Sequence, residues 1–529
     1  MALNHTDKDF RHEGVSYLDY KQIEMDRVLT AFLARLWWGG QSSVISRDER
    51  TEVTTDLVVR IMTDAPEWFT DFDPVVTRRW VETHLLDMVS RGRASQAVAG
   101  LRPLHGFIYR FRNARRSRAY NADEQLYEML THASENGRYV LRELKAFFFA
   151  GVDAHTEAPR LGTDVDVETQ ALISLSEILK LEITDRASGA RRRSCPPLYA
   201  GASELLADDI VRLLYHRDLI PRTVLVDYLK VLFAFHLALY QLTIMKLLPA
   251  MVSAGKPLPP DAGFFLDATD LPGSAPARLA ERSAAAWYDR IPAFVAATFT
   301  VKKLNDLADH LAKRNPRLRP AGGFQVSDLL PLLGTRYRLE RKAYASARLI
   351  AIDTACEVGE DDPVVTQLLQ LGLDDFTTYI EVITHYRVGF HRRYLIDCLD
   401  SLLLKNRPGA MIAQPRRGAR RFTLDSRMLE VLLQLALLHG TDGNATDLRT
   451  SPLRVDEFLA ILRKRYGLYI DELPSGDGFG SAIVTEHAAL RENRAAFIAR
   501  LREIGFYSDL SDAYLTQTIT PRYTIGASA

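Results

Sequence analysis

Residues 221–252 limit the possible folds of this chain more than any other stretch, because apolar side chains cover nearly every side of the helix that they predict. Such a helix needs neighbours on all sides. Its most apolar part, 231–245, is 15 residues long and is interrupted by His236 and Gln241. That is shorter than the roughly 20 residues that cross a bilayer. We therefore predict a buried helix at the centre of the molecule, with His236 as a core histidine that has a hydrogen-bond partner.

Amphipathic helices are predicted through most of the remaining chain. Within 19–40, four apolar residues follow the spacing i, i+3, i+4, i+7 of one helical face: Leu29, Phe32, Leu33 and Leu36. Similar stripes occur in 75–88, 123–149, 168–181, 278–297 and 301–314. Residues 264–266 are a short possible strand inside a connection rich in Pro and Gly. The predicted fold class is mainly α.

Breaks in this pattern divide the 529 residues into four predicted domains, in line with about 150 residues per domain. They are an N-terminal helical domain (1–160), a central helical domain around the buried helix 222–251 (161–320), a helical domain that ends in a basic loop (321–421) and a C-terminal module (422–529). The module has predicted helices at 425–439, from Ser451-Pro452 onward and at 484–504, then short strands at 506–507 and 518–525. Three helices followed by a β-hairpin is the order of a winged helix.

The overall composition excludes several classes of protein. The chain has 67 Lys and Arg against 67 Asp and Glu, 47% hydrophobic residues and 25% charged residues, which is typical of globular proteins and not of collagen-like, disordered or histone-like chains. Cys195, Cys356 and Cys398 lie far apart with no CxxC pair, so no disulfide framework or cysteine zinc site is predicted. Residues 1–13 are polar, unlike a secretory signal. We expect a reducing, cytoplasmic location.

The zero net charge is a balance of segregated blocks. Residues 102–118 hold six arginines and no acid, interleaved with aromatic residues, and residues 387–421 hold nine Lys and Arg against two acids; a third, short block is 191–193. Guanidinium groups pair with phosphates and aromatic rings stack on bases. The predicted phosphate contacts are Arg110, Arg112, Arg115, Arg116, Arg118, Arg416, Arg417, Arg420 and Arg421. The alternative is that these blocks are solvated loops, or that they pair with acidic segments of the same chain or of a partner.

The third helix of the C-terminal module offers a second candidate surface. His487, Arg491 and Arg494 follow i, i+4, i+7 and form one polar face that could enter a DNA major groove. Glu486 and Glu492 dilute its positive charge. Docking of a partner protein by this helix is therefore an equal alternative.

Acidic residues give weaker candidates for chemistry. Asp267 and Asp270 follow the possible strand at 264–266, a position from which nucleases and phosphatases deliver carboxylates, although a turn after a strand explains them too. The acidic stretch 151–168 lacks the spacing of a calcium loop. The sequence has no Walker loop, no GxSxG, no HExxH and no Cys/His cluster. We predict no catalytic residue, no metal and no cofactor, and lean toward a chain that is not an enzyme.

Several short motifs carry a resemblance. They are Pro221 with Tyr228-Leu229, the run Phe235-His236-Leu237-Ala238-Leu239-Tyr240, Arg465-Tyr466-Gly467-Leu468, Ile504-Gly505-Phe506, Leu510-Ser511-Asp512-Ala513, and Ile519 with Pro521-Arg522-Tyr523. The later part of the chain thereby resembles helical components of bacterial anti-phage defence systems of the methylation-associated type, which are encoded with ATPases, methyltransferases and nucleases. The resemblance brings no catalytic motif, and it implies a cytoplasmic subunit that works beside an ATPase or nuclease on foreign DNA.

The resulting hypothesis is a non-enzymatic DNA-engaging or scaffolding subunit of a bacterial defence complex. It would hold phosphates on arginine-rich surfaces, without base specificity, and dock DNA or a partner with the C-terminal winged helix. No membrane partner is expected. The alternatives are a metal-dependent nuclease or phosphoesterase that uses Asp267 and Asp270, and a pure protein-interaction scaffold.

Overall fold

The structure is a computed structural model, and it describes most of the chain. The described residues are 3–47, 55–69, 72–82, 102–111, 118–153, 155–160, 165–179, 183–189, 193–354, 363–415, 418–441, 444–476, 478–480, 483–507 and 518–526. The fold is mainly α-helical, as predicted. One continuous hydrophobic cluster runs from the N-terminal helices to the C-terminal ones, so the parts of the chain share a core.

The N-terminal part is a group of helices around α2. Its elements are α1 (His5–Lys8), α2 (Met25–Trp37), β1 (Ser43–Arg47), α3 (Thr55–Asp64), η1 (Pro66–Trp68), α4 (Pro74–Trp80), η4 (Gly106–Phe111), α5 (Ala122–Thr131), α6 (Gly137–Phe148), α7 (Val167–Leu179) and β2 (Ile183–Ala187). The predicted apolar stripe of α2 is buried in full. Phe32 of this stripe packs edge-on against Phe233 of the central helix, with ring centroids 5.3 Å apart.

Two details of this part differ from the sequence prediction. The single helix predicted at 123–149 is two helices, because the chain turns between Thr131 and Gly137. A Cβ at Gly137 would lie 2.1 Å from the carbonyl oxygen of Leu130, so the tight turn requires a glycine there. In addition, β1 pairs antiparallel with β2, so residues on both sides of the predicted boundary at 160 pack together.

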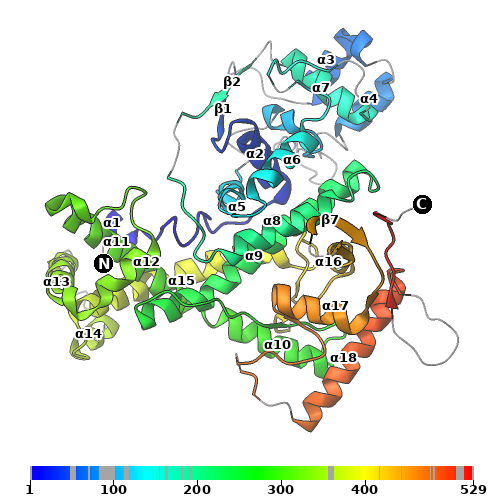
Figure 1. The fold of residues 1–529 in the computed structure, drawn as a ribbon. Coiled ribbons are helices and arrows are strands. Elements are labelled where there is room, and N and C mark those ends of the chain that lie inside the picture. The colour runs from blue at the N-terminus through cyan, green and yellow to red at the C-terminus, as the bar shows by residue number, and fades with distance from the viewer. Residues whose placement is uncertain are drawn as a thin grey trace.

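The central helix α9 (Arg222–Ala254) confirms the prediction of a buried helix. Among the described residues it is the one helix that is long and apolar enough to cross a membrane by length and composition, yet 94% of its most apolar window is buried inside the protein. It contacts α2, α8 (Gly201–Leu214), α11 (Ile291–Arg314) and α15 (Asp375–Leu403). Figure 1 shows α9 crossing the middle of the molecule, between the N-terminal helices and the C-terminal ones.

The helices after α9 form the remaining body. They are α10 (Ala275–Tyr288), η5 (Pro316–Leu318), α12 (Val326–Leu329), η6 (Leu330–Leu333), η7 (Thr335–Tyr337), α13 (Arg338–Thr354) and α14 (Pro363–Gln370). The helix break predicted near residue 299 lies instead at Asp289 and Arg290. α11 begins there with Pro292 in its first turn, where the missing N–H costs nothing because it would have no helical partner.

Short strands join the middle of the chain to its C-terminal part. The expected strand β3 (Phe264–Phe265) pairs in parallel with β9 (Leu468–Tyr469), and β4 (Ile412–Ala413) pairs antiparallel with β5 (Arg421–Phe422). A bridge from Asp267 to Thr423 links these two pairs. The basic loop 406–421 therefore ends inside a small buried sheet.

The C-terminal part contains α16 (Ser426–Ala436), the hairpin β6 (Leu438–Thr441) and β7 (Asn444–Thr450), β8 (Leu453–Arg454), α17 (Val455–Ile461), the π-helical turn η8 (Leu462–Tyr466), α18 (Val484–Glu503) and β10 (Thr518–Ile519). The predicted start of the second helix at Ser451-Pro452 is wrong, because Leu453 and Arg454 pair antiparallel with β10. Tyr507 forms a further antiparallel bridge with Ile519. The hairpin β6–β7 had not been predicted.

Candidate functional site

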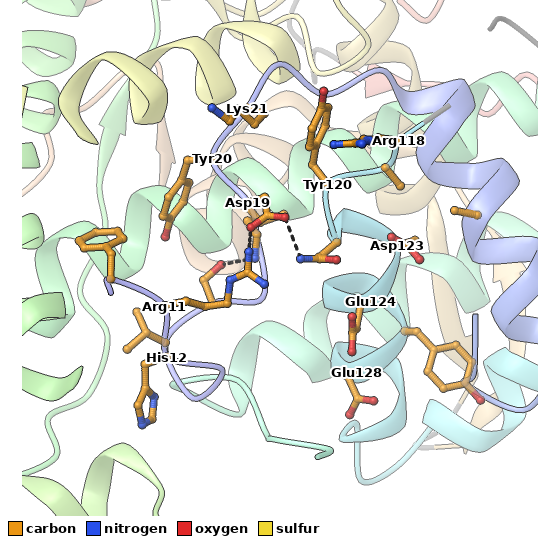
Figure 2. A pocket seen from close by; sticks show the side chains of 18 of the residues that line it. Arg11, His12, Asp19, Tyr20, Lys21, Arg118, Tyr120, Asp123, Glu124 and Glu128 are labelled. Atoms are coloured by element: carbon orange, nitrogen blue, oxygen red, sulfur yellow. Dashed lines mark hydrogen bonds and ion pairs between the residues drawn. The ribbon is translucent and has the colours of Figure 1, made fainter. Parts of the chain in front are cut away.

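A large open cavity lies where the N-terminal residues 5–21 cross between the N-terminal helices and α15. Its volume is about 1200 Å³. Its walls come from the N-terminal segment, α2, the loop and helix at 118–131, α6, Thr298 of α11 and the middle of α15. Figure 2 shows Asp19 and Arg11 in its centre and the acidic face of α5 along one side. No short sequence motif predicts this cavity, because the residues that line it are far apart in the sequence.

The N-terminal segment is fixed in place by buried contacts. Tyr379 of α15 donates a hydrogen bond to Asp7 at 2.7 Å, and Lys303 of α11 donates to the carbonyl oxygen of Thr6 at 2.5 Å. Phe10 stacks on His391 with ring centroids 3.9 Å apart. The segment therefore forms a permanent wall of the cavity.

Each carboxylate that lines the cavity already has a partner in the chain. Asp123 and Glu124 accept from Arg35 at 2.6 and 3.1 Å, which makes the pKa of Arg35 higher than usual although burial alone would lower it. The other carboxylates have their own partners: Asp19 pairs with Arg11, Asp9 with Lys302, and Glu128 accepts from Ser194. Arg11, Arg35 and Lys302 thus compensate part of the negative charge of the wall, whereas Glu128 is held by a hydroxyl.

Four cations of the wall have no such partner. Lys8, Lys21, Arg118 and Arg138 all line the cavity, and none forms an ion pair with a carboxylate among the residues that the structure describes. Lys21 lies instead over the ring of Tyr394, with its Nζ 3.4 Å from the centroid. Six Lys and Arg side chains and five Asp and Glu side chains line the cavity, so its formal net charge is slightly positive.

A strained turn borders the same cavity. Tyr120 and Asn121 have φ of 53° and 62°, in the left-handed region, which costs a non-glycine residue roughly 1–3 kcal/mol. Asp19 of the N-terminal segment holds the turn, because its N–H donates to the carbonyl of Tyr120 at 3.0 Å and its carboxylate accepts from Asn121 at 3.1 Å. The N-terminal segment thus maintains the shape of the wall at Tyr120.

Two buried histidines complete the wall in their neutral form. Burial, reinforced by nearby Lys302 and Arg193, lowers the pKa of His12 to about 4. Burial and the charge of Arg387 likewise lower the pKa of His391 to about 4. Nε2 of His391 has no hydrogen-bond partner among the described residues. At neutral pH this ring presents an unused polar atom beside the cavity.

The first arginine block is divided between the core and this cavity. Arg110 is only 1% exposed, so it does not belong to an exposed basic surface. It donates to Glu157 at 2.7 Å, to Asp185 at 3.3 Å and to the hydroxyl of Ser176 at 3.0 Å. Arg118 lines the cavity. Arg112, Arg115 and Arg116 lie outside the described residues.

The second block also supplies internal ion pairs. Arg421 is 2% exposed and donates to Asp267 at 2.9 Å, while Arg420 pairs with Asp400. Both arginines therefore form ion pairs with acidic residues of the same chain, which was the alternative to a phosphate contact. Arg416 and Arg417 lie outside the described residues, so a phosphate contact there stays a prediction.

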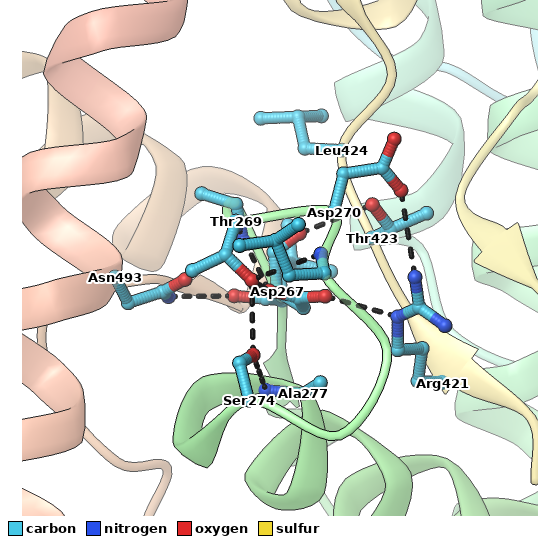
Figure 3. Close-up of polar contacts among 12 residues, drawn as sticks. Asp267, Thr269, Asp270, Ser274, Ala277, Arg421, Thr423, Leu424 and Asn493 are labelled. Atoms are coloured by element: carbon cyan, nitrogen blue, oxygen red, sulfur yellow. Dashed lines mark hydrogen bonds and ion pairs between the residues drawn. The ribbon is translucent and has the colours of Figure 1, made fainter.

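The carboxylates considered for metal chemistry are held by protein groups (Figure 3). Asp267 is fully buried; one oxygen accepts from Arg421 and the other from the backbone N–H and hydroxyl of Thr269. Asp270 pairs with Arg421 and Lys405. Among the described residues, no group of three His, Cys, Asp or Glu side chains is arranged to hold a metal ion. This geometry favours a structural role for Asp267.

Asn493 of α18 connects this cluster to two strands. Its side-chain amide donates to the carbonyl oxygens of Leu266 and Ile470, both at 2.8 Å, and its oxygen accepts from the N–H of Ala268 at 2.7 Å. One buried side chain thus links α18 to the ends of both β3 and β9. Sequence reasoning missed it, because a lone Asn inside a helix gives no local signal.

The three residues predicted on the third helix lie on α18 as expected. His487 and Arg491 are exposed. Arg494 is half-buried and forms ion pairs with Asp456 at 2.5 Å and with Asp471 at 3.7 Å. Two of the three side chains are therefore accessible to a partner.

The model of the methylation-associated defense system protein MAD7 family matches residues 5–523. The chain belongs to this family. No curated protein matches the chain. The match confirms the resemblance drawn from the sequence and extends it to nearly the whole length.

Two of the motifs that carried the resemblance to the MAD7 family meet at Asp209, while the motif Leu510-Ser511-Asp512-Ala513 lies outside the described residues. Asp209 of α8 is fully buried and accepts from His236 at 2.9 Å and from the hydroxyl of Tyr466 at 3.0 Å, and it pairs with Arg465. Burial alone would raise the pKa of Asp209, but these groups outweigh it and leave the pKa below its usual value. His236 is a core histidine with a partner, as predicted. These motif residues join the C-terminal part to α8 and α9.

Proposed function

We propose that this chain is a non-enzymatic subunit of a defence complex that engages DNA with its C-terminal module. The observation that supports it is that β8, which precedes α17, pairs with β10, which follows α18 and bridges to Tyr507; the hairpin β6–β7 and the elements η8 and β9 are inserted between these parts. A winged helix has this arrangement: three helices, with the strand before the second helix paired to a strand that follows the third. Membership of a defence-system family adds that the chain works with other components.

In this proposal α18 is the helix that enters the major groove. His487 and Arg491 point to solvent, and Arg494 can exchange Asp456, which is half-exposed, for a phosphate. Contacts of this kind release counterions from DNA, so binding weakens as salt rises. Two arginine–phosphate contacts correspond to roughly a 12-fold loss of affinity between about 50 and about 200 mM salt.

The test is fluorescence anisotropy with labelled duplex DNA and with single-stranded DNA of the same length at those two salt concentrations. The triple variant His487→Ala, Arg491→Ala, Arg494→Ala is expected to bind duplex more weakly and with a shallower salt dependence. Arg319→Ala is the matched control, because this exposed arginine lies in the loop after α11. No duplex binding at low salt, or a triple variant that binds like wild type, would defeat the proposal.

One observation favours a second candidate, a protein-interaction scaffold. The exposed face of α18 also carries small or apolar side chains at helical spacing: Val484, Ala488, Ala495 and Ala499. Such a stripe suits packing against another helix better than contact with phosphates. Co-expression with the ATPase and nuclease subunits of the same system, after nuclease digestion, separates the two. A stoichiometric complex that Ala488→Glu abolishes would support the scaffold.

A further inference from the structure

The cavity beside the N-terminal segment has an excess of usable positive charge. Four of the five carboxylates in its wall form ion pairs inside the protein and Glu128 accepts from a hydroxyl, whereas Lys8, Lys21, Arg118 and Arg138 have no carboxylate partner among the described residues. Arg118 and Lys21 lie on either side of Tyr120 along one edge of the cavity (Figure 2). A ligand with more than one negative charge would meet cations that nothing else neutralises.

The same edge offers aromatic surface. Phe390 lines the cavity and is 45% exposed. The guanidinium carbon of Arg387 lies 4.2 Å from the centroid of its ring, and Tyr394 stands one turn further along α15. A planar heterocycle can stack on rings of this kind irrespective of its hydrogen-bonding edge.

A buried polar atom provides an independent sign of a ligand. His391 is 7% exposed and lines the cavity, and its Nε2 has no partner among the described residues. Buried polar atoms in native proteins almost always have a partner. A ligand that carries hydrogen-bonding groups would supply it.

The size of the cavity favours a ligand larger than a bare anion. The volume of about 1200 Å³ is at the upper end of small-molecule sites, which occupy about 300–1000 Å³. Inorganic phosphate would leave most of this volume and all of the aromatic surface unused. The ligand must combine negative charge with an aromatic group.

We propose that this cavity binds a free nucleotide, with its phosphates on Arg118 and Lys21 and its base against Phe390. His391 lies within the same wall and offers a hydrogen bond to the sugar or base. This site is independent of DNA engagement by the C-terminal module, since the two share no residue. Binding of a nucleotide here would stiffen the contact between the N-terminal helices and α15, which the N-terminal segment already bridges.

The test is isothermal titration calorimetry of the full-length chain with ADP, GDP, CDP and UDP in turn, and with inorganic phosphate. At least one nucleotide is expected to bind more tightly than phosphate. Arg118→Ala and Lys21→Ala should each weaken binding by roughly 10- to 100-fold, as expected for the loss of a charge-assisted hydrogen bond. Phe390→Leu should weaken the nucleotide but leave phosphate unchanged.

Arg142→Ala is the matched control, because Arg142 is 71% exposed on α6 and does not line the cavity. Arg118 and Phe390 are exposed, so these variants are expected to melt like wild type, and melting curves verify this. No heat with any of the four nucleotides would overturn the proposal. So would equal affinity for phosphate and nucleotide, or tighter binding of a single-stranded oligonucleotide than of any nucleotide. DNA binding by the C-terminal module would be unaffected by all four variants.

Discussion

Arg110→Ala is expected to destabilise the N-terminal part of the protein rather than to remove a phosphate contact. The guanidinium is 1% exposed and lies between Glu157 and Asp185, with its carbon 3.8 Å from the centroid of the Phe107 ring. Truncation leaves Asp185, 8% exposed, with the hydroxyl of Tyr109 in place of a cation.

The size of the effect follows from the burial of the pair. Removing one partner of a buried ion pair costs about 3–5 kcal/mol, because the remaining charge stays buried without compensation. With a urea dependence of about 2 kcal/mol per M for a domain-sized unit, the unfolding midpoint should fall by roughly 1.5–2.5 M. An exposed arginine such as Arg142, changed to Ala, should shift stability by less than about 0.5 kcal/mol.

Tryptophan fluorescence is a suitable probe, because four of the five tryptophans lie in the N-terminal part: Trp37, Trp38, Trp68 and Trp80, with Trp287 in α10. Urea unfolding monitored this way therefore reports mainly on the region that contains Arg110. Arg110→Lys keeps the charge but loses the fork of donors, so its midpoint should lie between those of wild type and Arg110→Ala. In a double-mutant cycle with Asp185→Ala, the two losses should add up to more than the loss in the double variant. A midpoint for Arg110→Ala within about 0.3 M of wild type would refute the reasoning.

Three further outcomes are expected. Arg465→Ala should lower stability by about 3 kcal/mol in urea unfolding followed by circular dichroism, because it removes a cation from buried Asp209; an unchanged midpoint would contradict this. Gly467→Ala should lower the free energy of unfolding by well over 1 kcal/mol, since φ is +68° and the new Cβ would lie 2.2 Å from a carbonyl oxygen. Gly255→Ala is the control for the backbone conformation alone, because Gly255 has φ of +64° and nothing lies within 4 Å of the new Cβ. Equal losses of stability in the two variants would contradict the predicted clash at Gly467. The pKa of His391 is about 4 in the folded protein, so between pH 4 and about pH 6.5 His391 is protonated in the unfolded chain but not in the folded one. This difference should lower the free energy of unfolding by about 2 kcal/mol from pH 7 to pH 5. His391→Gln should reduce the pH dependence of stability by the same amount.

The local patterns of the sequence were sufficient for the helical architecture. The all-round apolar helix at 221–252 became α9, and the i, i+3, i+4, i+7 stripe of α2 is buried as its spacing required. Helix ends were less accurate, because turns depend on contacts such as that of Gly137 with Leu130 that lie outside the pattern of any one helix.

The local patterns of the sequence do not show whether a charged side chain forms an internal ion pair or stays in solvent. Residues 102–118 contain no acid, yet Arg110 forms an ion pair with Asp185, 75 positions later in the sequence. Arg421 likewise pairs with Asp267, which is 154 positions away. A run of arginines looks the same in sequence whether folding brings carboxylates to it or leaves it in water. Of the described arginines of the first block, Arg118 lines a cavity and Arg102 is exposed, so an anion can reach both.

The sequence by itself thus determined the mainly α fold, the buried central helix and the defence-system family, because apolar periodicity and motif spacing are properties of neighbouring residues. Tertiary structure alone decided which arginines stabilise the core and which line a cavity, because ion pairs and cavity walls join residues that are distant along the chain. Lys21 and Tyr394 come together only because α9 and its neighbours hold the first helices against α15.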